Sequence, residues 1–430
     1  MYKKYSFLVL LFLGLHLNTF AASKIQQLLE KKLPNATIKR IKTNDHFKEE
    51  YEIMIRQPLD HKNPAAGYFE QRIFLSHHDR KSPMVFVTEG YGARQRTYEL
   101  SKVLTSNQLI VEYRYYGKSK PINHDWKYLK NDLAMDDLHR LRLLFKKIYK
   151  KKWLATGISK GGTTTLTYKF RYPKDVHASV AYVAPLTLGQ EDKRTDEHIK
   201  NIGTKTCRDK LEAFQIEAFK RRDALVSMVQ TWAEEEKKVF DFMGYGRTVE
   251  YAILEYTFSF WQWGADCSTV PGPEASDQEY FDHLNKVVGY DFYSDATCDY
   301  FRPSYYQFVT ELGYYGFIHD HVEDYLVDDK NPSNLIFAPQ NTDLSYYNYS
   351  QPVIKWLDKY GDEIIYIYGE IDTWTACGYH PSPQVDALRL DLKGGSHYTR
   401  IATFDMADQD KVYAKLRSWM KAKINPLYNR

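Results

Sequence analysis

The sequence lacks a long hydrophobic run after its first 22 residues, so no later segment is expected to insert stably into a membrane as a spanning helix. It also lacks an excess of charge of one sign. The 59 Lys and Arg residues against 55 Asp and Glu residues give a formal charge of +4 over 430 residues, and the basic residues are interspersed with acidic ones. No nucleic-acid partner is therefore expected, because surfaces that bind nucleic acid need clustered basic residues.

Cysteine is scarce, and the chain has only four: Cys207, Cys267, Cys298 and Cys377. No Cys-x-x-Cys pair and no paired histidine spacing of the kind that binds zinc is present. The sequence therefore predicts no metal site and no cofactor.

The first 22 residues have the features of a secretory signal. Lys3 and Lys4 precede an apolar run over residues 7–15, and the small residues Ala21 and Ala22 follow it. Cleavage is expected after Ala21 or Ala22. No cysteine lies near this point, which argues against lipid attachment. We expect a secreted or periplasmic protein.

An exported chain meets an oxidising compartment in which cysteines can pair. Four cysteines allow three pairings. Cys267 and Cys298 both lie in the helical middle of the chain, and we expect them to be the bridged pair, with free thiols as the alternative.

The stretch over residues 153–162 predicts a nucleophile elbow. A short apolar run leads into Gly157-Ile-Ser159-Lys-Gly161, and the residues after it can form a helix that ends before Pro173. A serine on the sharp turn between a buried strand and a helix adopts strained backbone angles, and glycines fit the positions two residues before and after it. Ser159 is therefore the candidate nucleophile.

Candidate oxyanion donors lie at two places in the sequence. The all-apolar run at residues 84–88 reads as a buried strand, and Glu89-Gly90-Tyr91-Gly92 follows it. A hydrolase of this kind takes one backbone N–H from the residue after the serine and another from a glycine-containing loop after an early strand. Lys160 and either Tyr91 or Gly90 fit these positions.

A candidate acid and a candidate base follow two later strands. Residues 364–369 read as a strand, and Asp372 comes directly after it. The run at 388–392 leads through Gly394 and Gly395 to His397. The chain order Ser, Asp, His is the order of the α/β-hydrolases, in which the histidine removes the serine proton and the acid orients the imidazole.

Several motifs together resemble the secreted prolyl tri/tetrapeptidyl aminopeptidases, the S37 family of serine peptidases. More distantly, they resemble the prolyl carboxypeptidase and dipeptidyl peptidase group. The motifs are Gln-Pro-Leu-Asp-His-x-Asn-Pro at 57–64, Glu-Gly-Tyr-Gly at 89–92, Glu-Tyr-Arg-Tyr-Tyr-Gly-Lys-Ser at 112–119 and Thr-Gly-Ile-Ser-Lys-Gly-Gly at 156–162.

The resemblance implies an α/β-hydrolase fold with an inserted helical cap, and a serine exopeptidase that cuts after proline. With the change in composition along the chain, it divides the sequence into a signal (1–22), a first part of the core (23–186), a helical cap (187–350) and a second part of the core (351–430).

Aromatic segments of the expected cap are candidates for a peptide-binding groove, although aromatics at helical spacing more often form a core. A free amino terminus needs an anionic partner when it leaves water. Glu311 is the first candidate, in a segment that also resembles the family, and Asp266 is the alternative. Tyr306 near Glu311 and Trp263 near Asp266 are expected to bind substrate as well.

Three functions fit these features. The first is an exported serine exopeptidase that releases tri- or tetrapeptides from a free amino end through an acyl-enzyme, with the preference for cutting after proline implied by the resemblance. The second is an ester or lipid hydrolase of the same fold, although the cap is polar and aromatic rather than rich in Leu and Ile. The third is a binding protein without activity, which would have no need for a serine, an acid and a histidine together.

Overall fold

The computed structural model of the protein describes residues 22–429 apart from 45 and 124. The expected secretory signal spans residues 1–22, and residues 1–21 of it lie outside the described residues.

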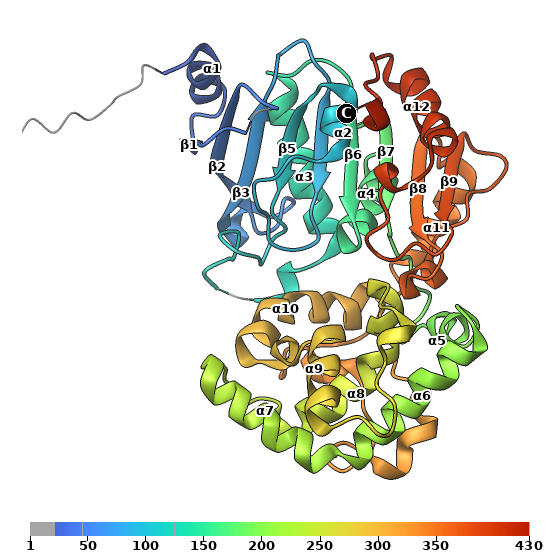
Figure 1. Ribbon diagram of the computed structural model, residues 1–430. Helices are drawn as coiled ribbons and strands as arrows, with labels where there is room; N and C mark the ends of the chain where they lie inside the picture. The colour runs from blue at the N-terminus through green and yellow to red at the C-terminus, as the bar shows by residue number, and fades with distance from the viewer. Residues whose placement is uncertain (1–21, 45, 124, 430) are drawn as a thin grey trace, which may run out of the picture.

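One nine-stranded sheet, in the order β1-β2-β3-β5-β4-β6-β7-β8-β9, forms the upper half of the molecule in Figure 1. The first three strands and β5 pair antiparallel, and the pairs from β5 onward are parallel. The strands are β1 (Ala36–Ile41), β2 (Glu49–Pro58), β3 (Tyr68–His77), β4 (Met84–Thr88), β5 (Asn107–Val111), β6 (Trp153–Ile158), β7 (Ala178–Tyr182), β8 (Ile364–Gly369) and β9 (Ala387–Leu392).

Sequence patterns explain where the strands lie. β2 alternates between buried and less buried residues and pairs antiparallel with β3, whereas all five residues of β4 are buried. Central parallel strands are covered on both faces and therefore lack polar alternation. Val85 and Val87 pack in the core on one face, with α2 (Glu99–Leu104) and α12 (Met406–Met420). Phe86 faces the opposite core, against Trp153 and Tyr168.

Helices α1 (Lys24–Lys32) and α3 (Asn131–Lys146) pack in that opposite core, while α4 (Lys160–Arg171) lies on the same face with α11 (Ser350–Tyr360). These helices cover the parallel strands and bury their side chains.

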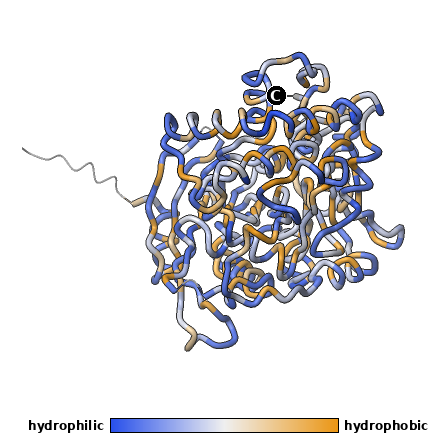
Figure 2. Tube along the Cα trace, turned by 90° about the horizontal axis from the view of Figure 1, so that it is seen from below, coloured by the Kyte–Doolittle hydropathy of each residue, from blue (hydrophilic) through white to orange (hydrophobic). Residues whose placement is uncertain are grey.

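Between β7 and β8 the chain forms a helical region, called the cap below, which lies against one end of the sheet (Figure 1). Its helices are α5 (Arg194–Ile199), α6 (Lys205–Lys220), α7 (Arg222–Glu236), α8 (Gly244–Trp263), α9 (Asp277–Val287) and α10 (Asp295–Gln307). Hydrophilic and hydrophobic segments alternate along the helices seen from this end (Figure 2), as expected when each helix buries one side.

The cap has its own hydrophobic core, centred on α8. Thirteen of the 20 residues of this helix are buried. The helix ends at Gly264, whose φ of 69° is the left-handed conformation that glycine adopts without a steric penalty. Among the described residues, no helix is both long enough and apolar enough to cross a membrane.

The order of the strands, the parallel centre and a serine on the turn from β6 to α4 define an α/β-hydrolase fold with a helical cap. This confirms the predicted fold class.

The expected bridge between Cys267 and Cys298 is wrong. Cys267, in the short turn η3 (Cys267–Thr269), is bonded to Cys207 near the start of α6, with the Cα atoms 5.8 Å apart. Cys298 and Cys377 are free and buried. Two cysteines of the cap can form a disulfide only if their Cβ atoms also face one another. Cys298 lies in the buried part of α10 and is not bonded to Cys267.

Peptide mapping without reduction should recover Cys207 linked to Cys267. Cys298 and Cys377 should resist alkylation until the protein is denatured, because burial raises the pKa of both thiols, that of Cys298 to about 12. The bridge closes a loop with a sequence separation of 60 residues, so its loss is expected to reduce the free energy of unfolding by about 2–4 kcal/mol. Recovery of a peptide that links Cys267 to Cys298 would contradict this pairing.

Candidate active site

Ser159 lies on the sharp turn between β6 and α4, with φ 56° and ψ −128°. A side chain in this region of backbone space is strained, and such strain persists only where the surroundings enforce it. A Cβ added to Gly157 would lie 2.0 Å from the carbonyl oxygen of Gly161, and one added to Gly161 would lie 2.8 Å from that of Thr88. The turn therefore requires glycine on both sides of the serine.

Asp372 and His397 are hydrogen bonded, with 2.7 Å between Asp372 Oδ2 and His397 Nδ1. Asp372 is fully buried where the chain leaves β8, and its other carboxylate oxygen accepts a hydrogen bond from the Trp374 amide. The bond to Asp372 leaves the Nε2 atom of His397 free to act as a base.

The end of α8 holds the loop that carries His397. The amide of His397 donates to the carbonyl oxygen of Gln262 at 2.8 Å. A Cβ added to Gly264 would lie 2.9 Å from Cβ of Ser396, so glycine permits this close contact. The cap therefore helps to position a residue of the core.

Ser159 and His397 line one cavity of about 720 Å³ between the core and the cap, called the main cavity below. This volume is in the usual range for the binding site of a small ligand. The structure therefore brings the predicted nucleophile and base to one cavity, with the predicted acid directly behind the base.

Two of the predicted oxyanion donors, Lys160 and Tyr91, line a small cavity together with Ser159. Lys160 begins α4, where amides have no helical acceptor, and a Cβ added to Gly90 would lie 2.7 Å from the Lys160 carbonyl carbon. The Tyr91 side chain interacts with Ser159 by a hydrogen bond, and burial raises the pKa of its phenol, which keeps it neutral.

The side chain of Lys160 ties the elbow to its surroundings. Its Nζ atom donates to the carbonyl oxygen of Gly90 at 2.8 Å and to Oε1 of Gln307 at 2.9 Å, and it lies 3.8 Å from the centre of the Tyr113 ring. Burial lowers the pKa of this lysine to about 7, although the charge of Glu311 acts in the opposite direction. One side chain thus connects α4, the loop after β4 and the cap.

Sequence reasoning missed Glu255, in the middle of α8, which lines the same cavity as Ser159. Its carboxylate accepts hydrogen bonds from the hydroxyl groups of Ser259 and Tyr315. Burial raises the pKa of Glu255 to about 7, against the effect of both hydrogen bonds. The sequence does contain a feature that singles out Glu255, because it is one of only two acids in the apolar stretch 249–261.

Comparison with known proteins identifies the family. Residues 32–427 match the sequence profile described as PS-10 peptidase S37. The chain belongs to this family. The peptidase is also 33% identical over 374 residues to the prolyl tri/tetrapeptidyl aminopeptidase of Streptomyces mobaraensis, a match that covers 85% of this chain and 78% of that one. It is therefore a hydrolase of the serine peptidase class, and the resemblance seen in the sequence motifs is confirmed.

More distant likenesses also occur. A probable serine protease of Arabidopsis thaliana, EDA2, is 24% identical over 201 residues, which cover 41% of each chain. Among solved structures, the proline iminopeptidase of Mycobacterium smegmatis covers 86% of this chain and 97% of its own, with 12% identity and a TM-score of 0.45.

Of the residues predicted to bind substrate, the structure brings Trp263 to the main cavity of the peptidase, with its ring 5.6 Å from that of His397. Glu311, Tyr306 and Asp266 do not line this cavity. Glu311 is buried and accepts a hydrogen bond from the Asn131 amide at 2.8 Å, at the start of α3.

Tyr306 packs against Trp126 in the core of the peptidase, with 5.4 Å between the ring centres. Asp266 is exposed and accepts a hydrogen bond from the Ser268 amide at 2.8 Å, which caps the turn η3. Neither contact is with a group of the main cavity.

A smaller cavity of about 80 Å³ lies directly beside the serine. Much of its wall is aromatic or aliphatic. Its lining residues are Tyr91, Ser159, Lys160, Thr163, Pro185, Thr187, Gln262, Phe308, Leu312, Gly313, Tyr314 and Trp374.

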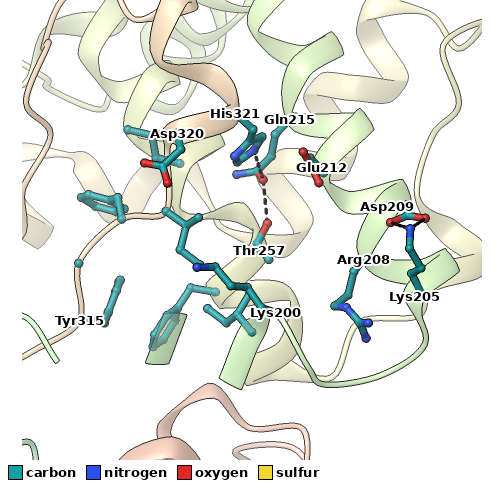
Figure 3. Close-up of a pocket in the computed structure, with 16 residues that line it drawn as sticks. Lys200, Lys205, Arg208, Asp209, Glu212, Gln215, Thr257, Tyr315, Asp320 and His321 are labelled. Atoms are coloured by element: carbon teal, nitrogen blue, oxygen red, sulfur yellow. Dashed lines mark hydrogen bonds and ion pairs between the residues drawn. The ribbon is translucent and has the colours of Figure 1, made fainter. Parts of the chain in front are cut away.

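Another cavity, of about 400 Å³, lies inside the cap. His321 and Thr257 both hydrogen bond to Gln215 on its wall, and Lys205 pairs with Asp209 at its edge (Figure 3). Neither Ser159 nor His397 lines it, although Tyr315 lies on the wall of both this cavity and the one that Ser159 lines. In the part of the chain that the structure describes, no group of three or more His, Cys, Asp or Glu residues is placed to hold a metal ion.

Proposed function

We propose that this peptidase is an exported exopeptidase that releases tri- or tetrapeptides from free amino termini by cutting after proline. Ser159 is the nucleophile, His397 the general base and Asp372 the residue that orients the base. The observation that carries the proposal is the Asp372–His397 hydrogen bond of 2.7 Å behind a cavity that the strained Ser159 shares with His397.

In the proposed reaction, Ser159 Oγ attacks the carbonyl carbon of the proline, and His397 Nε2 takes the serine proton. The imidazolium then gives this proton to the leaving amine as the C–N bond breaks, which leaves an acyl-enzyme. Water attacks the ester with His397 again as the base, and the acid product and Ser159 are released. Asp372 holds the tautomer of His397 and stabilises its charged form.

The oxyanion of each tetrahedral intermediate is proposed to accept hydrogen bonds from the backbone amides of Lys160 and Tyr91. Donors already in place before the reaction cost no reorganisation when the charge develops. The contact of Lys160 Nζ with the carbonyl oxygen of Gly90 fixes the loop that contains the second donor, and Gly90 allows this loop to approach α4.

Preference for proline is supported by two observations. The relative from Streptomyces mobaraensis carries this specificity in its name. The cavity of about 80 Å³ beside Ser159 has a wall that includes Phe308, Tyr314 and Trp374, which suits a compact pyrrolidine ring. Proline also loses little conformational entropy on binding, because its ring already fixes φ.

Mass spectrometry of the products that the enzyme releases from a panel of proline-containing peptides tests this function. Peptides with a free amino end and proline at position three or four should yield the amino-terminal tri- or tetrapeptide. Acetylation of the amino end should suppress release, whereas amidation of the carboxyl end should not. Hydrolysis confined to simple esters, or cleavage at internal sites regardless of the amino end, would contradict the proposal.

A further inference from the structure

Glu255 is a buried carboxylate without a counter-charge. The residue is 6% exposed, and its partners are the hydroxyl groups of Ser259 and Tyr315, both of which are neutral donors. No Lys, Arg or His side chain in the described part of the chain forms an ion pair with it. An ionised carboxylate in such a place is costly, because two neutral hydrogen bonds do not replace the hydration of a full charge.

The other acid of the same cavity shows the contrast. Glu89 also lines it, yet Arg96 lies 3.1 Å from its carboxylate and the Tyr98 hydroxyl donates to it at 2.6 Å. Glu89 is thus neutralised within the protein, and Glu255 is not.

The basic side chains of the cavity do not compensate Glu255 either. They are Arg72, Arg94, Arg96 and Arg400. Arg72 pairs with Glu112 at 2.6 Å, and Arg400 donates to the backbone carbonyl groups of His397 and Thr399. Arg94 is exposed to solvent. Glu255 is thus an uncompensated carboxylate that lines the cavity, where a cationic group of a ligand can pair with it.

We propose that Glu255 binds the protonated amino terminus of the peptide substrate. This inference rests on the proposed exopeptidase function and adds the residue that reads the free end. An ammonium group offers three donors and a full positive charge, which restores the compensation that the carboxylate lacks. Because Glu255 and Ser159 line the same cavity, a bound amino terminus lies at a fixed separation from the nucleophile.

The surroundings of Glu255 suit a cation. Tyr305, Tyr314 and Tyr315 line the same cavity as Glu255, and the Tyr315 hydroxyl donates to its carboxylate. Aromatic faces attract ammonium groups, and phenol rings exclude water without adding a positive charge of their own.

Glu311 is the competing candidate from the sequence, and it differs from Glu255 in two respects. Both are buried acids of the cap whose pKa burial raises to about 7. Glu311 does not line the cavity of Ser159, and the charges of Lys130 and Lys160 act on its carboxylate, whereas no cationic side chain does so on Glu255. The geometry therefore favours Glu255.

Substrate recognition should depend on pH in a way that follows from this burial. The pKa of Glu255 is raised to about 7, so its charge is present above that value and lost below it. Tyr305, Tyr314 and Tyr315 have pKa values well above 10 and stay neutral. The preference for a free-amine peptide over its des-amino analogue should therefore grow as the pH rises through about 7, until the substrate amine loses its own proton near pH 8.

The test compares Glu255→Gln with the wild-type enzyme, Glu311→Gln and the exposed cap variant Glu234→Gln. The measured quantity is the ratio of kcat/KM for a free-amine peptide to that for its des-amino analogue, in which hydrogen replaces the amine. Rates are normalised to active sites titrated with a small phosphonate that reacts with Ser159. We expect Glu255→Gln to lower this ratio about ten- to a hundredfold, mainly through KM, and Glu234→Gln to leave it unchanged.

Each outcome separates the two proposals. A wild-type enzyme that treats both peptides alike would refute the exopeptidase function itself. A wild-type preference that Glu255→Gln retains, or that only Glu311→Gln loses, would overturn the role of Glu255 and leave the exopeptidase function standing. If Glu255→Gln does not fold, the pH dependence of the ratio in the wild-type enzyme decides: a ratio that stays flat between pH 6 and 8 overturns the role.

Discussion

Replacement of Ser159 by alanine is expected to reduce peptide release at least about a thousandfold while the fold stays intact. The loss is large because the variant has no hydroxyl to form the acyl-enzyme, and removal of a nucleophile leaves only the residual catalysis of the oxyanion donors and substrate binding. Alanine keeps the Cβ that the strained turn already accommodates at φ 56°. Steady-state release of a proline-containing tripeptide measures the effect.

Ser227→Ala is the matched control, because this serine is exposed on α7. Its turnover should equal that of the wild-type enzyme. Thermal unfolding of both variants should remain close to wild type. Near wild-type turnover by Ser159→Ala would refute the assignment of the nucleophile and, with it, the proposed mechanism.

Features that depend on neighbouring residues could be predicted from the sequence. The strained elbow has a local cause at Gly157, where an added Cβ would lie 2.0 Å from the carbonyl oxygen of Gly161 in the same turn. Asp372 and His397 follow β8 and β9, and strands that run parallel deliver the residues after them to one edge of the sheet. The sheet therefore converts three separated sequence positions into neighbours.

Features that depend on packing inside the cap could not be predicted in this way. Cys207 meets Cys267 only because α6 packs against α8, a contact between helices that composition does not specify. Glu255 and Glu311 both lie among aromatic residues in the sequence. In the structure, Glu255 lines the cavity, whereas Glu311 contacts the start of α3. Side-chain direction in a helix is set by tertiary packing as well as by spacing.

His397→Ala should be about as damaging as Ser159→Ala, with a loss of at least about a thousandfold in kcat, because the serine proton then has no acceptor. Asp372→Asn should cost less, since the acid orients the imidazole and stabilises its charge but neither attacks nor transfers a proton. The hydrogen bond of 2.7 Å between Asp372 and His397 is the contact that this substitution changes.

The double variant Ser159→Ala/His397→Ala gives the sharpest test of whether the two residues act as one unit. Groups that serve the same step are strongly non-additive, so the second substitution should add almost nothing to the first. Rates of the two single variants and the double variant, measured with one peptide at saturating concentration, give this comparison. A double variant slower than either single variant by the product of the two losses would show that His397 acts independently of Ser159, and the base would then have to be sought among the other groups of the cavity.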